Sequence, residues 1–138
     1  MKELNINLTV AALTLGLAFS IGALAEGLSK ESYKLGKDAI SAEYKAAKGA
    51  CASMSGNYKD VCLAQAEGKK KVGLAELEAS YQPTAKNHYE ARIAKAEADY
   101  ALAKEECDVK TDDAKDACLK EAKAVETAAK ADAKAAMK

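Results

Sequence analysis

The sequence CASMSGNYKDVC, residues 51–62, decides the fold, because it places two cysteines symmetrically about one tight turn. The midpoint of Cys51 and Cys62 falls between Gly56 and Asn57. Glycine supplies the left-handed stop that helices favour, and Asn57 is positioned to cap the next helix. The two helices that meet here run antiparallel, so the cysteines lie at one level, where a disulfide closes without distortion. The stretch therefore predicts a disulfide-linked helical hairpin.

A second copy of this unit runs from Cys107 to Cys118. The ungapped shift that superposes Cys51 on Cys107 also superposes Tyr33 on Tyr89, Tyr44 on Tyr100, Ala47-Lys48 on Ala103-Lys104, Lys59-Asp60 on Lys115-Asp116 and Cys62-Leu63 on Cys118-Leu119. Four cysteines permit three connectivities, and equal distance from each turn favours Cys51–Cys62 and Cys107–Cys118. We expect an all-α fold of two tandem antiparallel hairpins, about four helices in all, with repeats at 26–82 and 83–138.

The first helix of each copy carries a narrow stripe of side chains at helical spacing. In the first copy Ser29 is the expected N-cap, and the stripe consists of Tyr33, Ile40, Tyr44, Ala47 and Cys51. In the second copy it consists of Tyr89, Ile93, Ala96, Tyr100, Ala103 and Cys107. The tyrosines Tyr33, Tyr44, Tyr89 and Tyr100 have two interpretations. They either fill an alanine-lined seam between helices or form a ladder on which a partner docks, because tyrosine is favoured at interfaces.

The second helix of each copy is less regular. In the first copy, Cys62, Ala66, Gly73 and Leu77 share a face with Lys69. Gly68 and Gly73 weaken this helix by about 1 kcal/mol each relative to alanine, so we expect it to be the most mobile. In the second copy, the apolar face is expected to hold Cys118, Ala122, Val125, Ala129 and Ala136. Pro83, the only proline, marks a break or a kink between the copies, and a break is favoured.

Residues 1–25 have the anatomy of a secretory signal peptide. An uncharged stretch from Leu4 to Ala25 follows Lys2 and Glu3 and ends in Ala23-Leu24-Ala25. The alternative is an uncleaved anchor, since about 20 apolar residues span a bilayer. The cleavage pattern and the polar continuation favour removal, which predicts a mature chain that begins at Glu26 without a stable membrane span.

The predicted mature chain is neutral, with 20 basic and 20 acidic residues. No field of one sign attracts nucleic acid, and nucleic-acid binding is disfavoured. Between Glu26 and Lys138 the chain holds 27 alanines but only 13 Leu, Ile, Val and Phe together. Helices of this composition pack closely around a thin core, and a small exported domain of this kind depends on its disulfides.

No pattern of residues indicates catalysis, a cofactor or a metal site. The sole histidine, His88, lacks the company that zinc or copper requires, and we expect it to face solvent. The sequence contains no Cys-x-x-Cys, no glycine-rich phosphate loop and no Ser-His-Asp set. The carboxylates are scattered among lysines, which is typical of solvated helix surfaces. An enzyme is not expected.

The paired Cys-x10-Cys hairpins, with Asp60–Leu63 and Asp116–Leu119 in an Ala/Lys/Glu-rich background, resemble a group of small exported proteins of Gram-negative bacteria. Such chains are compared with the helical stalk of the Tol-system envelope protein. The resemblance implies a periplasmic location and no activity. A weaker likeness is to a lysozyme-inhibitor family with a cysteine pair on a helical hairpin. Cys51, Cys62, Leu74, Leu77 and Tyr81 match its positions, and Met137 stands where Tyr81 would repeat.

The sequence thus favours a non-enzymatic periplasmic or secreted protein that acts through protein–protein contact or envelope support. Its partner is an unidentified protein or a second copy of itself. Inhibition of a cell-wall hydrolase is the alternative, followed by metal or redox buffering through a labile disulfide.

Overall fold

The computed structural model describes residues 27–137, so the predicted signal peptide, residues 1–25, lies outside the described part. This part folds into four helices: α1 (Lys30–Cys51), α2 (Gly56–Tyr81), α3 (Ala85–Cys107) and α4 (Asp112–Ala135). The turns at 52–55 and 108–111 close the two hairpins, and a third turn at 82–84 joins them. The predicted all-α fold of two tandem disulfide-linked hairpins is confirmed.

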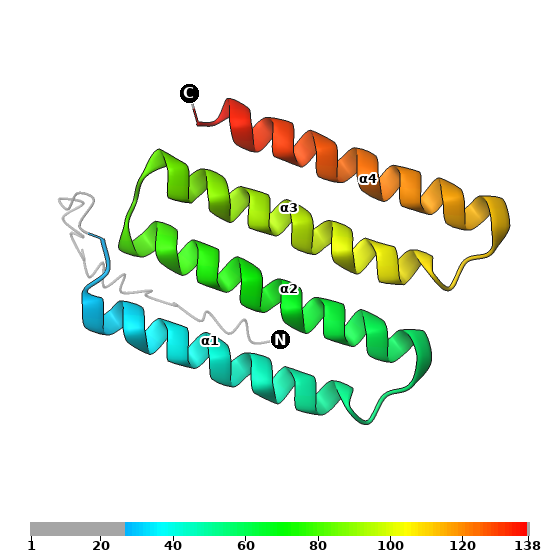
Figure 1. Ribbon diagram of the computed structural model, residues 1–138, viewed down its shortest axis with the longest axis horizontal. Helices are drawn as coiled ribbons and strands as arrows, with labels where there is room; N and C mark the ends of the chain where they lie inside the picture. Colours follow the sequence, from blue (N-terminus) through cyan, green and yellow to red (C-terminus); the bar gives the residue numbers. More distant parts are fainter. Residues whose placement is uncertain (1–26, 138) are drawn as a thin grey trace, which may run out of the picture.

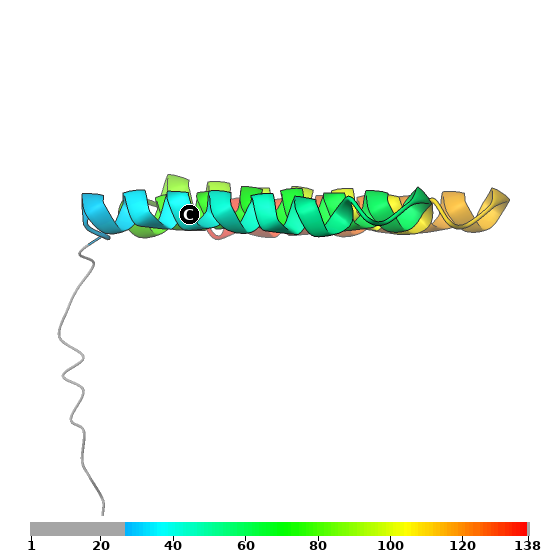
Figure 2. The same cartoon turned by 90° about the horizontal axis from the view of Figure 1, so that it is seen from below.

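The four helices lie side by side in chain order and form a single flat layer (Figure 1). Viewed edge-on, the layer is one helix thick (Figure 2). Within residues 27–137, contacts between helices occur only from α1 to α2, α2 to α3 and α3 to α4. The array therefore does not close into a bundle. Helices α1 and α4 form its edges, and no other described element covers either face of the layer.

The N-cap side chains of α1 and α3 make capping hydrogen bonds, whereas those of α2 and α4, Ser55 and Thr111, make none. The Ser29 side chain accepts a hydrogen bond from the Ser32 N–H, as expected of an N-cap. Pro83 lies in the break between α2 and α3, and Thr84 caps α3. The predicted capping role of Asn57 is wrong, because Ser55 occupies the N-cap position of α2. Asn57 instead donates its side-chain N–H to the Glu105 carbonyl, 2.6 Å away, at the end of α3.

The two disulfides lie at one end of the layer, beside the α1–α2 and α3–α4 turns (Figure 1). Each joins Cα atoms 5.7 Å apart, a usual spacing for a bridge. The repeat extends to the backbone of the turns. Gly56 has a left-handed φ of 57°, and Asp112, its equivalent in the second copy, has a φ of 51°. The second turn therefore places a residue with a side chain where the first has glycine.

The core contains almost no bulky side chains. Among the described residues, those buried are the cysteines Cys51 and Cys107, seven alanines and Glu126. Val125, expected on the apolar face of α4, is 61% exposed, whereas its neighbour Glu126 is 5% exposed. Val125 shares its face with Cys118, Ala122 and Ala129, as expected, but this face lines a groove and is not fully buried, because α4 packs against α3 alone.

Close backbone approach replaces bulk in the seams between helices. A Cβ atom built at Gly36 of α1 would lie 2.8 Å from Leu77 Cδ1, and one at Gly68 of α2 would lie 3.1 Å from Ala98 Cβ. Gly73 packs against Ile40 in the same way. The glycines of α2 thus face neighbours on both of its sides. Helix α2 lies between α1 and α3 and contacts both. The greater mobility expected of α2 stays a prediction.

Candidate interaction surface

The first pair of stripe tyrosines lies in the seam between α1 and α2. The Tyr33 ring stacks on Tyr81 at 4.4 Å, and its hydroxyl donates to the Glu78 carboxylate at 2.6 Å. That hydrogen bond raises the pKa of Tyr33, since it favours the protonated phenol. Tyr44 donates to Glu67 at 3.4 Å. Both rings are half-buried.

The second pair, Tyr89 and Tyr100, is half-buried on α3. Tyr100 faces α4, where the Lys123 ammonium lies 4.9 Å from its ring centroid. In the first copy Lys70 lies 4.5 Å from the Tyr44 ring. Tyr33 and Tyr44 therefore lie in the α1–α2 seam and Tyr100 lies at the α3–α4 seam, so the structure does not bring all four tyrosines into one ladder. Their role in binding stays a prediction.

The charged residues beside Tyr44 and beside its repeat equivalent, Tyr100, are exchanged between the two copies. Glu67 and Lys70 flank Tyr44, and the repeat shift carries them to Lys123 and Glu126. Each tyrosine thus has a lysine against its ring. In the first copy this lysine is Lys70, whereas in the second copy it is Lys123, the repeat equivalent of Glu67. A cation over an aromatic face contributes about 0.5–1 kcal/mol at exposed sites.

A groove runs over α2 between α1 and α3. Its apolar lining comes from all three helices and includes Ile40, Tyr44, Val72, Gly73, Ala98 and Leu102. Its charged lining residues are three acids and three lysines: Glu43, Glu76, Asp99, Lys69, Lys70 and Lys95. None of these charged residues was identified as a site residue from the sequence, because lysines and acids are scattered along every helix.

A second groove lies between α3 and α4. Ala96 and Ala103 line it from α3, and Ala122 and Val125 line it from α4. Asp99 lines both grooves, so both open on the same side of α3. We call this side of the layer the groove face.

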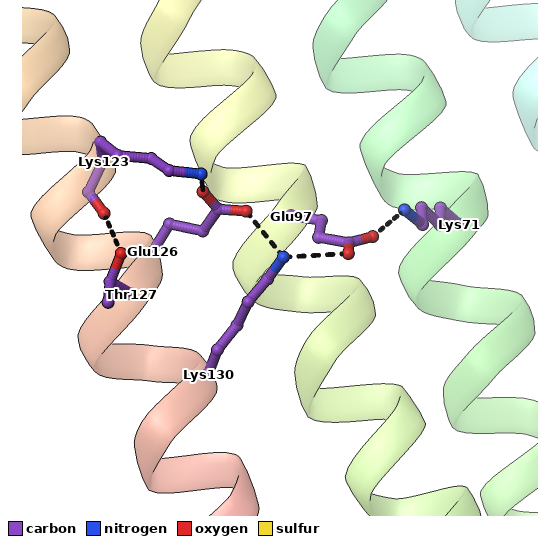
Figure 3. Close-up of polar contacts among 6 residues, drawn as sticks. All are labelled: Lys71, Glu97, Lys123, Glu126, Thr127 and Lys130. Carbon is purple, nitrogen blue, oxygen red and sulfur yellow. Dashed lines mark hydrogen bonds and ion pairs between the residues drawn. The ribbon is translucent and has the colours of Figure 1, made fainter.

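The opposite face carries a chain of ion pairs across three helices (Figure 3). Glu97 of α3 pairs with Lys71 of α2 and with Lys130 of α4, the latter at 3.1 Å. Lys130 also pairs with Glu126 at 2.9 Å, and Glu126 pairs with Lys123 at 2.7 Å. We call these five residues the ion-pair ladder.

Helix geometry places Glu97 and Lys71 away from the central groove, whereas Glu126 is buried in the α3–α4 seam and also lines the second groove. Glu97 stands between Lys95, two residues before it, and Asp99, two residues after it, and both of these line the central groove. A helix turns by about 100° per residue, so residues two positions apart point to nearly opposite sides. The same spacing separates Lys71 of the ladder from Lys69 of the groove. The central groove therefore opens on one side of the layer, and Glu97 and Lys71 lie on the other; at the groove itself, Lys95 and Asp99 also pair, at 2.9 Å.

The ladder shifts the pKa values of its own groups. Hydrogen bonds from Lys71 and Lys130 hold the pKa of Glu97 below its ordinary value of 4.5. Lys123 and then Lys130 lower the pKa of Glu126 in the same way. The carboxylates of Glu126 and Glu97 in turn raise the pKa of Lys130. The lowered pKa values favour the ionised carboxylates of Glu97 and Glu126, and the raised pKa favours the charged ammonium of Lys130.

The residues that carry the lysozyme-inhibitor likeness lie in or near the α1–α2 seam. Leu77 packs against Gly36, and Tyr81 stacks on Tyr33. Leu74 is half-buried on α2. Cys51 and Cys62 form the first disulfide.

The remaining chemistry-bearing side chains form no cluster among the described residues. His88 is exposed, as expected. Within residues 27–137, no group of three His, Cys, Asp or Glu side chains is arranged to hold a metal ion, and all four cysteines are in disulfides. None of the four described helices is both long and apolar enough to cross a membrane. Two disulfides are typical of a protein that folds in an oxidising compartment.

Comparison with protein-family models, with curated proteins and with solved structures gave no match to this chain.

Proposed function

We propose that this chain is a non-enzymatic periplasmic protein that acts through protein–protein contact at its groove face, in support of the cell envelope. The observation that carries the proposal is the single uncovered layer of helices. Folded domains bury their apolar surfaces between two or more layers. Here one layer leaves Ile40, Val72 and Leu102 half-buried in an open groove.

The periplasmic location rests on the disulfides and on the signal peptide expected at residues 1–25. It is tested by the intact mass of the exported protein, which should correspond to a chain that begins at Glu26 with both disulfides formed. A mass that retains residues 1–25 in exported material would contradict this part of the proposal.

Contact through the groove face is tested by chemical cross-linking in intact envelopes, followed by capture and quantification of the products. A groove variant, Lys69→Glu with Lys95→Glu, reverses two exposed charges at the central groove. A control variant, Lys45→Glu with Lys104→Glu, makes the same change at exposed positions outside both grooves. We expect one stoichiometric product with the wild type and the control, and its loss with the groove variant. Catalytic turnover by the purified protein, abolished by changing one side chain, would refute the non-enzymatic assignment.

A second candidate, inhibition of a cell-wall hydrolase, is favoured by the chain around the first disulfide. Tyr58 is 83% exposed and Met54 is 44% exposed, both between Cys51 and Cys62. An exposed aromatic residue in the first turn of α2, held beside a disulfide, is suited to enter an enzyme cleft, because little conformational entropy is lost on binding. This function predicts stoichiometric loss of lysozyme activity that Tyr58→Ala abolishes, and a flat titration with the wild type would dispose of it.

A further inference from the structure

Within residues 27–137, no second layer of helices covers the apolar groove. Every buried apolar residue of the described chain is an alanine or a cysteine, which shows that the bulkier side chains remain partly in water. Ile40, Val72 and Leu102 are among them, and all three line the central groove. Covering them would bury apolar surface at about 25 cal/mol per Å².

The groove face is better suited to be covered than the opposite face. The ladder residues satisfy one another, from Lys71 through Glu97 and Lys130 to Glu126. Removing such pairs from water costs free energy that their mutual attraction does not always repay. The groove face, in contrast, has an apolar centre with charges around it, which is the usual anatomy of a protein interface.

The charges of the groove favour a neutral occupant with both signs on its surface. Three acids and three lysines line the central groove, so the groove has no net charge. A strongly acidic or basic partner would leave half of these charges facing the same sign. A second copy of the chain presents the same balanced set. A two-fold axis can bring acids of one copy opposite lysines of the other, because such an interface pairs one patch with itself.

The dimensions of the layer also fit a second copy. Helices of 22 to 26 residues are about 33–39 Å long at a rise of about 1.5 Å per residue. Four of them at interaxial distances of about 8–10 Å span about 35 Å. One face therefore offers about 1,200 Å² per copy, or about 2,400 Å² for two copies in full contact, and stable interfaces need about 1,200–2,000 Å² in total. Contact over half of each face would already bury about 1,200 Å² in total, the lower end of this range.

We propose that two copies of this chain stack through their groove faces into a two-layer, two-fold symmetric dimer, with the ion-pair ladders on the outside. This inference rests on the proposed function, contact through the groove face, and names a second copy as the partner. Flatness favours such stacking, since two flat faces can meet over their whole area.

The first test is sedimentation equilibrium of the oxidised protein from about 1 to about 200 μM, a range that brackets micromolar affinities. We expect a monomer–dimer equilibrium without higher species, since the interface pairs one patch with itself and closes at two copies. A monomer over the whole range, or an open series of larger species, would overturn the proposal.

The second test exchanges charges across the dimer. The groove variant leaves five acids and one lysine in the central groove, and a complementary variant, Glu43→Lys with Glu76→Lys, leaves five lysines and one acid. All four changed positions are exposed, so the monomer should stay folded, which circular dichroism verifies. We expect each variant alone to dimerise at least about tenfold more weakly, and an equimolar mixture to recover wild-type affinity.

The control variant should dimerise as the wild type does. If both groove variants also match the wild type, or if their mixture fails to recover affinity, the groove faces do not meet and the proposal is wrong. These outcomes are separate from the test of the proposed function. A wild-type monomer that still gives a groove-dependent cross-linked product with a different protein would refute the dimer and retain the contact function.

Discussion

Removal of the second disulfide, by Cys107→Ala with Cys118→Ala, tests what holds the edge of the layer in place. The two cysteines are 11 residues apart in sequence. In the chain-entropy model, closing a loop of this size stabilises the folded state by about 3 kcal/mol. The first disulfide closes a loop of the same size, so the matched variant Cys51→Ala with Cys62→Ala should lose the same amount.

This loss converts into a shift in the melting temperature. Unfolding has an entropy of about 2.1 cal/mol/K per residue, or about 230 cal/mol/K for residues 27–137. A change of about 3 kcal/mol divided by this entropy lowers the melting temperature by about 13 °C. The helical signal in circular dichroism measures this directly for both variants.

The two variants should differ in where the structure loosens. Helix α4 contacts only α3, through a seam whose buried members are alanines and Glu126. Helix α1 contacts only α2, but the Tyr33–Tyr81 stack holds it at the end away from the disulfide. We therefore expect hydrogen exchange to increase along the whole of α4 in the second variant. In the first variant, the increase in α1 should stay near the turn.

Two results would refute this reasoning. A decrease in melting temperature of less than about 4 °C, the effect of about 1 kcal/mol, would show that packing between helices and not the disulfide holds the hairpin together. Equal exchange along α1 and α4 would show that the tyrosine stack adds no local stability.

Three further predictions concern single contacts. Gly56→Ala should lower the free energy of unfolding by about 1 kcal/mol, whereas Asp112→Gly should raise it by a similar or smaller amount, because both positions are left-handed; urea unfolding measures both. Acidification should destabilise the protein, because the pKa values of Glu97 and Glu126 are lowered in the folded state. The stability that these two groups contribute is present above pH 4.5 and is lost as the pH falls through their folded-state pKa values. Substituting Gln at both positions should flatten this part of the pH–stability curve. Asn57→Ala should destabilise by about 1 kcal/mol, since a carbonyl at the end of α3 loses its donor, and no change in chemical denaturation would show that water replaces it.

The elements and the disulfides of this fold are predictable from sequence because their signals are local. Ser29 and Pro83 act on the backbone next to them, so they fix where α1 begins and where α2 gives way to α3. The disulfide pairing followed from the equal distance of each cysteine from its turn.

The arrangement of the helices was not predictable, because a middle helix has two contact sides. In α2, Gly68 faces α3 and Gly73 faces α1, and from the sequence both were interpreted only as weak helix formers. From the sequence alone, an alanine or glycine in a contact seam cannot be distinguished from one on a solvated surface. The single layer therefore becomes visible only when the neighbours of α2 are known.

The ion-pair ladder was missed for a related reason. Glu97, Lys71 and Lys130 come from three different helices, and nothing in a lysine-rich sequence distinguishes them from solvated charges. Asn57 was misassigned because its local capping role competed with a carbonyl at the end of α3. Both cases require contacts between distant parts of the chain.

The central claim is that the four helices form one open layer, because the groove face exists only in that arrangement. It is tested most directly by the distance between spin labels on non-natural amino acids at Ala42 and Ala124, which are exposed near the middle of α1 and α4. Labelled protein is diluted with unlabelled protein, so that only distances within one chain are measured. The open layer predicts helix axes separated by three spacings, about 24–30 Å, whereas a closed four-helix bundle would bring α1 and α4 to about 8–10 Å and contradict the account.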